Sequence, residues 1–208
     1  MRIPESIRKF ADFFSKLPGI GPRQAIRLGF YLAESGEGAR AEAEKAIESL
    51  ADIKICTRCF YVHDTKGELC EICSDSSRDQ STVAIIEKET DLMSLENIGK
   101  FKGVYLVIGD IRKKSILEPG QKLRLQSLKA RLKELPPSTS SGQSGGKAKE
   151  IIIAVNPTSV GNINAAAIAD ELKGSTEKIT RLGIGIPSGG EIEFADVETL
   201  GGALERRT

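Results

Sequence analysis

The four cysteines of this chain are the feature that most constrains how it can fold. They form two Cys-x-x-Cys pairs, Cys56 with Cys59 and Cys70 with Cys73, separated by ten residues. Two such knuckles on facing turns bring four thiolates to one point, which is the tetrahedral sulfur set that zinc prefers. Two disulfides or four buried thiols are the alternatives, and the paired spacing favours zinc. Because four protein ligands complete the coordination shell, we expect a structural zinc site without an open catalytic position.

The N-terminus and the composition narrow the class of protein. Residues 1–5 lack the apolar segment of a secretory signal, and no apolar run is long enough to span a bilayer. These features predict a cytoplasmic protein without a membrane segment, in a compartment that keeps thiolates reduced. Aromatic residues make up only 5% of the chain, so stacking on nucleic-acid bases is not an expected binding mode. His63 lies between the two knuckles, but four thiolates suffice and we do not expect it to bind the metal.

The first 53 residues are predicted to be helical. Residues 5–33 fit two helices joined by a tight turn, and residues 37–53 fit a third. Two sets of apolar residues at helical spacing are expected to face a core: Ile7, Phe10, Phe13, Phe14 and Leu17 on the first helix, and Ala43, Ala46, Ile47 and Leu50 on the third. The net charge of +1 hides a division, because residues 1–33 carry six basic and two acidic side chains, whereas residues 34–53 carry two basic and six acidic ones.

The turn between the first two helices has the chemistry of a phosphate site. Gly19 and Gly21 leave backbone N–H groups uncovered, and Pro22 suits the first position of the next helix, whose N-terminus favours an anion. Arg23 and Arg27, four residues apart, share one face of that helix. Such an arrangement can hold a phosphodiester without reading bases, which predicts sequence-independent DNA binding through Gly19, Ile20, Gly21, Arg23 and Arg27. The alternative is a simple Gly-Pro helix break with solvated arginines, and a phosphate clamp alone does not exclude RNA.

After the cysteines, the pattern changes to strands alternating with helices. Continuous β-branched apolar runs predict strands at residues 83–86, 104–108, 151–155 and 179–186. Helical patterns lie between or after them, at residues 89–99, 121–135, 162–173 and 196–206. Alternating units of this kind indicate an α/β fold with a mostly parallel sheet. Residues 136–148 are poor in apolar side chains and are predicted to be a surface loop.

Several motifs, in this order, resemble the RecR family of bacterial recombination mediators. Residues 17–28 look like that family's helix-hairpin-helix, and the four-cysteine zinc finger follows, with Asp75, Arg78 and Asp79 after its last cysteine. Residues 85–87 are similar to the opening of a Toprim domain, and residues 180–190 to the closing segment of the family. The resemblance therefore predicts an α+β protein of several parts: an N-terminal helix-hairpin-helix (1–53), a small four-cysteine zinc finger (54–79), a Toprim-like α/β domain (80–186) and a C-terminal segment with a helix (187–208).

The resemblance also implies a function and partners. RecR-like proteins are not enzymes; they form clamps or rings around single- or double-stranded DNA. With RecO and, in many bacteria, RecF, they help to load RecA onto single strands. This implies DNA repair by a homodimer or homotetramer that holds Zn²⁺ through Cys56, Cys59, Cys70 and Cys73 and faces DNA with Arg23 and Arg27.

The alternative function is that of a metal-dependent Toprim nuclease or related phosphotransfer enzyme. Such an enzyme needs a glutamate after the first strand and an Asp-x-Asp after a later one, because hard dications require several oxygen ligands. Glu87 is present, but Asn156-Pro157-Thr158 follows the strand at 151–155. One carboxylate cannot assemble the site, so Glu87 is expected to bond a neighbouring backbone N–H group. Val160 replaces an acidic residue usual in the family, and this predicts an altered RecO contact.

A second basic patch is possible in residues 112–133. Arg112, Lys113 and Lys114 begin it, and the helix that follows adds Arg124 and Arg131, one heptad apart and therefore on one face. We expect either a solvated helix face or a second phosphate-binding surface.

Overall fold

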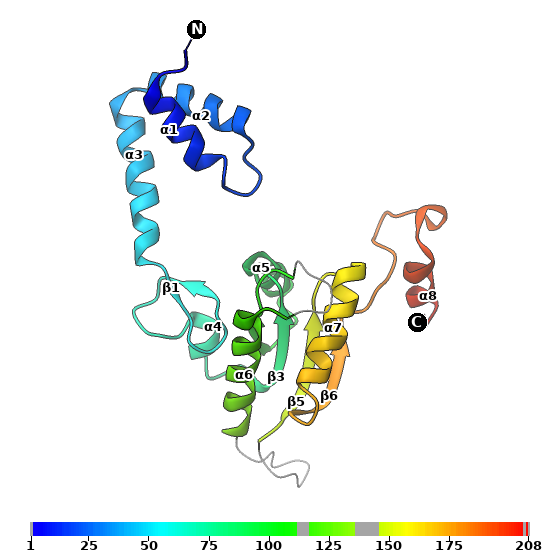
Figure 1. Ribbon diagram of the computed structural model, residues 1–208. Helices are drawn as coiled ribbons and strands as arrows, with labels where there is room; N and C mark the ends of the chain where they lie inside the picture. Colours follow the sequence, from blue (N-terminus) through cyan, green and yellow to red (C-terminus); the bar gives the residue numbers. More distant parts are fainter. Residues whose placement is uncertain (1, 112–116, 136–145, 206, 208) are drawn as a thin grey trace. The chain divides into compact units, whose positions relative to one another are not determined.

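The computed structural model describes residues 2–111, 117–135, 146–205 and 207. The chain divides into two compact units, Met1–Ile53 and Lys54–Thr208, and Figure 1 gives the order of their elements. Among the helices of the described residues, none is long and apolar enough to cross a membrane.

The N-terminal unit consists of helices. They are α1 (Glu5–Phe14), α2 (Pro22–Glu34), α3 (Gly36–Glu48) and the short 3-10 helix η1 (Ser49–Asp52). The first two pack against each other through Ile7 and Ala11 of α1 and Ala25 and Gly29 of α2, all of which are buried. A Cβ atom on Gly29 would lie 3.1 Å from Cγ2 of Ile7, so the absence of a side chain permits this close approach of the two helices.

The apolar residues of α3 do not face a core within this chain. No residue of α3 is buried, and the side chains of Ile47 and Leu50 are 56% and 65% exposed. The expectation that they face inward is therefore wrong, as it is for Phe13, which is 61% exposed. Periodicity shows that a helix has an apolar side, but it does not show that the same chain supplies a surface to cover it.

The second unit opens with a small antiparallel pair, β1 (Lys54–Ile55) and β2 (Val62–His63), and the single turn α4 (Glu71–Ser74). A four-stranded sheet follows, in the order β4-β3-β5-β6, and every neighbouring pair in it is parallel. Its strands are β3 (Asp79–Ile86), β4 (Gly103–Val107), β5 (Ala148–Ala154) and β6 (Thr176–Arg181).

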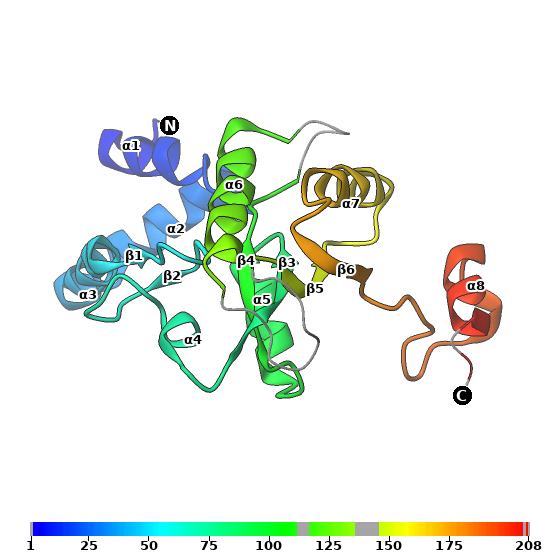
Figure 2. The ribbon, with the colours of Figure 1, turned by 90° about the horizontal axis from the view of Figure 1, so that it is seen from below.

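Helices cover both faces of this sheet, as Figure 2 shows. They are α5 (Glu89–Asn97), α6 (Pro119–Lys133) and α7 (Ser159–Glu171). Alternate residues of β3 divide the core between the two faces. Val83 and Ile85 share one cluster with leucines of α6 and with Ile168 of α7, whereas Ala84 and Ile86 share the other with Leu92 of α5. Burial on both faces explains why these strands are continuously apolar in the sequence.

The C-terminal segment contains the 3-10 helix η2 (Ile192–Phe194) and α8 (Val197–Glu205). The strand predicted at 179–186 is shifted: β6 spans Thr176–Arg181 and pairs Ile179 with Ile151. Beyond Arg181 the chain leaves the sheet, and Leu182 is 47% exposed. Most of the predicted loop, residues 136–145, lies outside the described residues, and its last residue, Ala148, belongs to β5.

This architecture confirms the predicted fold class. The described chain has N-terminal helices, a four-cysteine cluster, an α/β domain with a four-stranded parallel sheet, and a C-terminal helix.

Candidate functional site

The four cysteines come together as one buried cluster. Their sulfur atoms all lie within 4.8 Å of one another, and each residue is at most 3% exposed. Cys56 and Cys59 flank a tight turn after β1, in which the N–H of Phe60 donates to the carbonyl of Cys56. Phe60 has a φ of 62°, the one positive value outside glycine among the described residues. Cys70 and Cys73 lie at the start of α4, and together the two turns converge on a single point.

The geometry fits a tetrahedral metal site. A zinc–sulfur distance of about 2.3 Å gives sulfur–sulfur edges of about 3.8 Å. The sulfur atoms of Cys59 and Cys70 are 3.5 Å apart, and all four cysteines are free of disulfides. His63 is not part of the cluster; its Nδ1 is 2.8 Å from the hydroxyl of Thr65. The structure therefore contains a buried four-cysteine cluster that could hold a metal ion.

The four thiols of the cluster affect one another's protonation. Hydrogen bonding from Cys59 and the other two thiols lowers the pKa of Cys56, whereas hydrogen bonding to Cys56, together with burial, raises the pKa of Cys59 and of Cys73. Four buried thiols at this distance cannot all lose their protons unless a positive charge compensates them. A divalent ion would supply that charge and convert all four thiols to ligands.

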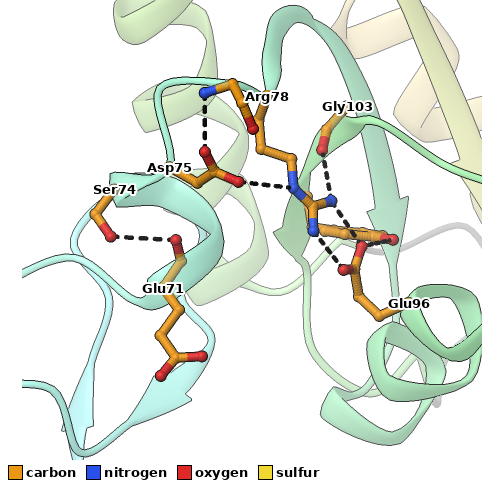
Figure 3. Close-up of polar contacts among 8 residues, drawn as sticks. Glu71, Ser74, Asp75, Arg78, Glu96 and Gly103 are labelled. Carbon is orange, nitrogen blue, oxygen red and sulfur yellow. Dashed lines mark hydrogen bonds and ion pairs between the residues drawn. The ribbon is translucent and has the colours of Figure 1, made fainter. Parts of the chain in front are cut away.

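A bidentate ion pair joins Arg78, at the end of the zinc-finger segment, to Glu96 of α5 (Figure 3). Arg78 donates from Nη1 to Oε1 of Glu96 at 2.8 Å and from Nη2 to Oε2 at 2.5 Å, and also from Nη1 to the carbonyl of Gly103 at 3.3 Å. The hydroxyl of Tyr105 donates to the same carboxylate at 2.6 Å, and Asp75 lies 3.8 Å from Nε of Arg78. The hydrogen bonds from Arg78 lower the pKa of Glu96, while burial and the bond to Glu96 raise the pKa of Tyr105.

The two arginines of α6 also contact the zinc-finger segment. Arg124 donates to the carbonyl of Val107 at 2.9 Å, and its guanidinium lies 5.1 Å from the centre of the Phe60 ring. Arg131 donates to the carbonyl of Arg58, between the first two cysteines, at 3.4 Å. Val107 in turn donates its N–H to the carbonyl of Cys59 at 2.8 Å.

These contacts correct both expectations for the helix face that carries Arg124 and Arg131. The two side chains do share a face, and each half-buried guanidinium contacts the turn at residues 58–60, so neither is a freely solvated group; phosphate binding by this face stays a prediction. Lys129 is engaged as well, in a 2.6 Å ion pair with Glu171 of α7. The first residues of the predicted patch, Arg112, Lys113 and Lys114, lie outside the described residues.

The glycine turn of the N-terminal unit has the predicted local form. Gly19 has a φ of 79°, which a glycine adopts without strain, and Gly21 precedes α2 with Pro22 as its first residue. No heavy atom lies within 4 Å of the Cβ position at Gly19 or Gly21, so the backbone there is open to a ligand. Arg23 and Arg27 are exposed, and neither guanidinium pairs with another described residue. Ile20 lies between the two glycines and is half-buried.

Glu87, which follows β3 at the carboxyl edge of the parallel sheet, has a structural role. Its Oε1 accepts the N–H of Asn156 at 2.7 Å, as expected from the sequence, and the residue is 6% exposed. Thr158 caps α7 by accepting the N–H of Gly161 at 3.0 Å. In the described residues, the four cysteines are the group of His, Cys, Asp and Glu side chains that could hold a metal ion.

Sequence reasoning missed the contacts that hold the zinc finger to the sheet. Arg78 was visible as a motif residue after the last cysteine, but its partners Glu96 and Tyr105 follow 18 and 27 residues later in the sequence and carry no spacing signal. The heptad spacing of Arg124 and Arg131 did indicate a shared face. Because this face lies beside the leucine stripe of α6, which is buried, the sequence could have indicated that the two arginines also face the protein.

Two family models match residues 81–208 of this chain, and known proteins match its whole length. Residues 81–183 match the Toprim domain, and residues 185–208 match the family described as RecR, C-terminal. A protein named recombination protein RecR from Thermus thermophilus is 39% identical over 207 residues, covering 100% of this chain and 98% of that protein. Proteins of the same name from Herpetosiphon aurantiacus and Chloroflexus aurantiacus are 36% and 35% identical and cover 98% and 99% of this chain. On this full-length similarity, the chain belongs to the RecR family.

Proposed function

We propose that this protein is a sequence-independent DNA-binding mediator of recombination and repair. The relatives named recombination protein RecR support the process. The observation that carries DNA binding is the open glycine turn at Gly19 and Gly21, followed by exposed Arg23 and Arg27 on the first turns of α2. Backbone donors at a helix N-terminus and two unpaired guanidinium groups suit phosphate oxygens, which are the same in every sequence.

The other parts of the chain support this role without contacting DNA. We assign Zn²⁺ to Cys56, Cys59, Cys70 and Cys73, where it would act as a structural ion that folds residues 54–79. The α/β part (80–186) and the C-terminal segment (187–208) would provide contacts to other proteins. Membership of the family supports a homodimer or homotetramer that surrounds DNA, with RecO and RecF as partners in loading RecA.

The same membership supports a non-enzymatic protein. A Toprim enzyme places several carboxylates at the carboxyl edge of its sheet to hold magnesium. Here Glu87 is engaged with the backbone of Asn156, and β5 is followed by Asn156, Pro157 and Thr158. Cleavage of DNA by the pure protein with Mg²⁺ would contradict this assignment.

The test of DNA binding removes both arginines. Replacement of Arg23 and Arg27 by alanine should reduce the slope of log affinity against log salt by about 1.8, which corresponds to about 60-fold weaker binding at 0.1 M salt. Fluorescence anisotropy with labelled DNA of two unrelated sequences measures both quantities. We expect the loss to be equal for the two sequences, because phosphate contacts carry no sequence information.

A matched control removes two positive charges elsewhere. Lys45 of α3 and Lys100 are both exposed, and the double alanine variant should change the slope much less. Equal loss in both double variants would mean that net charge, not the glycine turn, drives binding. If RNA of the same length competed as strongly as DNA does, the result would instead favour a general nucleic-acid-binding protein.

A further inference from the structure

Arg131 reaches from α6 to the first knuckle of the four-cysteine cluster. Its Nη1 donates to the carbonyl of Arg58, which lies inside the first knuckle between Cys56 and Cys59. Its Nη2 is buried and has no hydrogen-bond partner among the described residues. Burial lowers the pKa of Arg131, while Cys73, Cys59 and Cys56, in that order, act through their charge to raise it.

This placement is unfavourable unless a negative charge is close. Nη2 of this half-buried side chain is removed from water, and the single carbonyl at 3.4 Å from Nη1 replaces little of the lost hydration. A buried charge without a compensating partner destabilises the folded state. Among the described ion pairs, Glu96 engages Arg78 and Glu171 engages Lys129, and none of these pairs includes Arg131. Four neutral thiols would not provide the missing charge.

The metal-loaded cluster would provide it. Four thiolates around one divalent ion would carry a net charge of −2, and Arg131 contacts the knuckle that contributes two of these thiolates. We propose that Arg131 is the counter-ion of the metal–thiolate centre, and that this charge interaction couples metal retention to the docking of the zinc finger on α6. The zinc assignment on which this rests is part of the proposed function.

Two further observations favour a role toward the centre over simple packing. Arg124, one heptad earlier on the same helix, contacts the ring of Phe60 and the carbonyl of Val107. Arg124 therefore already packs this helix face against the turn, and Arg131 is not needed for that purpose. Arg58 also carries a positive charge at the knuckle, but its side chain is exposed and screened by water. The charge of Arg131 should therefore act on the metal–thiolate centre more strongly than the charge of Arg58.

The experiment compares four variants of the full chain: Arg131→Lys, Arg131→Gln, Arg131→Met and the control Lys133→Gln. Lys133 is exposed near the end of the same helix, so its replacement removes one positive charge from the solvent-facing side. Transfer of zinc to a chromogenic chelator gives the relative affinity. We expect the Gln and Met variants to lose about 10- to 100-fold in metal affinity, the range seen for outer-shell partners. The Lys variant should stay close to the parent, as should the control.

A spectroscopic readout separates charge from packing. In protein loaded with Co²⁺ instead of zinc, a nearby positive charge stabilises the sulfur lone pairs and raises the energy of sulfur-to-cobalt charge transfer. The Gln and Met variants should therefore move this band to longer wavelength, while the ligand-field bands of a tetrahedral sulfur site stay in place. The Lys variant should keep the parent band.

Three results would overturn the proposal. The first is unchanged zinc affinity together with an unchanged charge-transfer band in the Gln and Met variants. The second is a Met variant that behaves as the parent while the Gln variant does not, because that pattern indicates packing. If the Gln and Met variants do not fold, the Lys variant decides: its folding with bound zinc supports a charge role, and its failure to fold contradicts it.

Discussion

The ion pair between Arg78 and Glu96 should stabilise the second unit by a measurable and pH-dependent amount. The side chains are 16% and 24% exposed, and two hydrogen bonds join them. Replacing Glu96 by Gln keeps the shape and one acceptor oxygen but leaves the guanidinium uncompensated. A fully buried pair would lose about 3–5 kcal/mol on such a change. Because water still reaches both groups, we expect a loss of about 2–3 kcal/mol in the free energy of unfolding.

The pH dependence follows from the pKa of Glu96. Hydrogen bonds from Arg78 hold this pKa below its ordinary value of 4.5 in the folded protein. The pair therefore contributes fully above the unfolded-state pKa, and its contribution is lost as the pH falls through the lowered folded-state pKa. The Glu96→Gln variant should lack this acid-dependent term, so parent and variant should become more alike in stability below pH 4.5.

Urea denaturation followed by far-UV circular dichroism, at neutral pH and in acid, measures this difference. Asp170→Asn is the control, because its ion pair with Lys173 joins side chains that are 75% and 82% exposed and should contribute nothing measurable. A double-mutant cycle with Arg78→Met should give a coupling of about 1–2 kcal/mol. A coupling near zero, or equal effects of Glu96→Gln and Asp170→Asn, would refute the reasoning.

Two further changes test how the zinc finger is held. Cys70→Ser should release the metal and reduce the stability of the second unit, while the glycine turn of the first unit keeps its local structure. Metal analysis measures the release, and circular dichroism measures the stability. A fully folded variant that lost only DNA affinity would contradict the structural role of the ion. Arg124→Met should cost about 1–3 kcal/mol, since it removes the stacking on Phe60 and the hydrogen bond to Val107 but keeps most of the aliphatic volume. Thermal unfolding measures this loss, and an unchanged midpoint would mean that the stacking contributes nothing.

Much of the fold could be predicted from local patterns. The β-branched runs indicated β4, β5 and the second half of β3, because strands buried on both faces are apolar at successive positions; the partly exposed β6 was predicted too far along the chain. The cysteine spacing predicted the cluster, since two residues between ligands suffice to bring both sulfurs to one point. The bond from Asn156 to Glu87 could also be predicted, because a buried carboxylate at a strand end requires a donor. Gly19 and Pro22 likewise indicated the turn and the start of α2.

Other features depended on contacts between distant parts of the chain. The sequence by itself determined which residues share a helix face, because 3.6 residues per turn is a local property. Only the tertiary structure decided what each face meets: the face with Ile47 and Leu50 remains exposed within the chain, whereas the face with Arg124 and Arg131 contacts the first knuckle. Arg131 and Arg58 are 73 residues apart, and no local spacing encodes their contact. The physical reason is that burial and charge pairing depend on which distant segments of the chain pack against a helix face. Here the first knuckle packs against α6, so that Arg131, which the sequence suggests is solvated, lies next to the cysteine cluster.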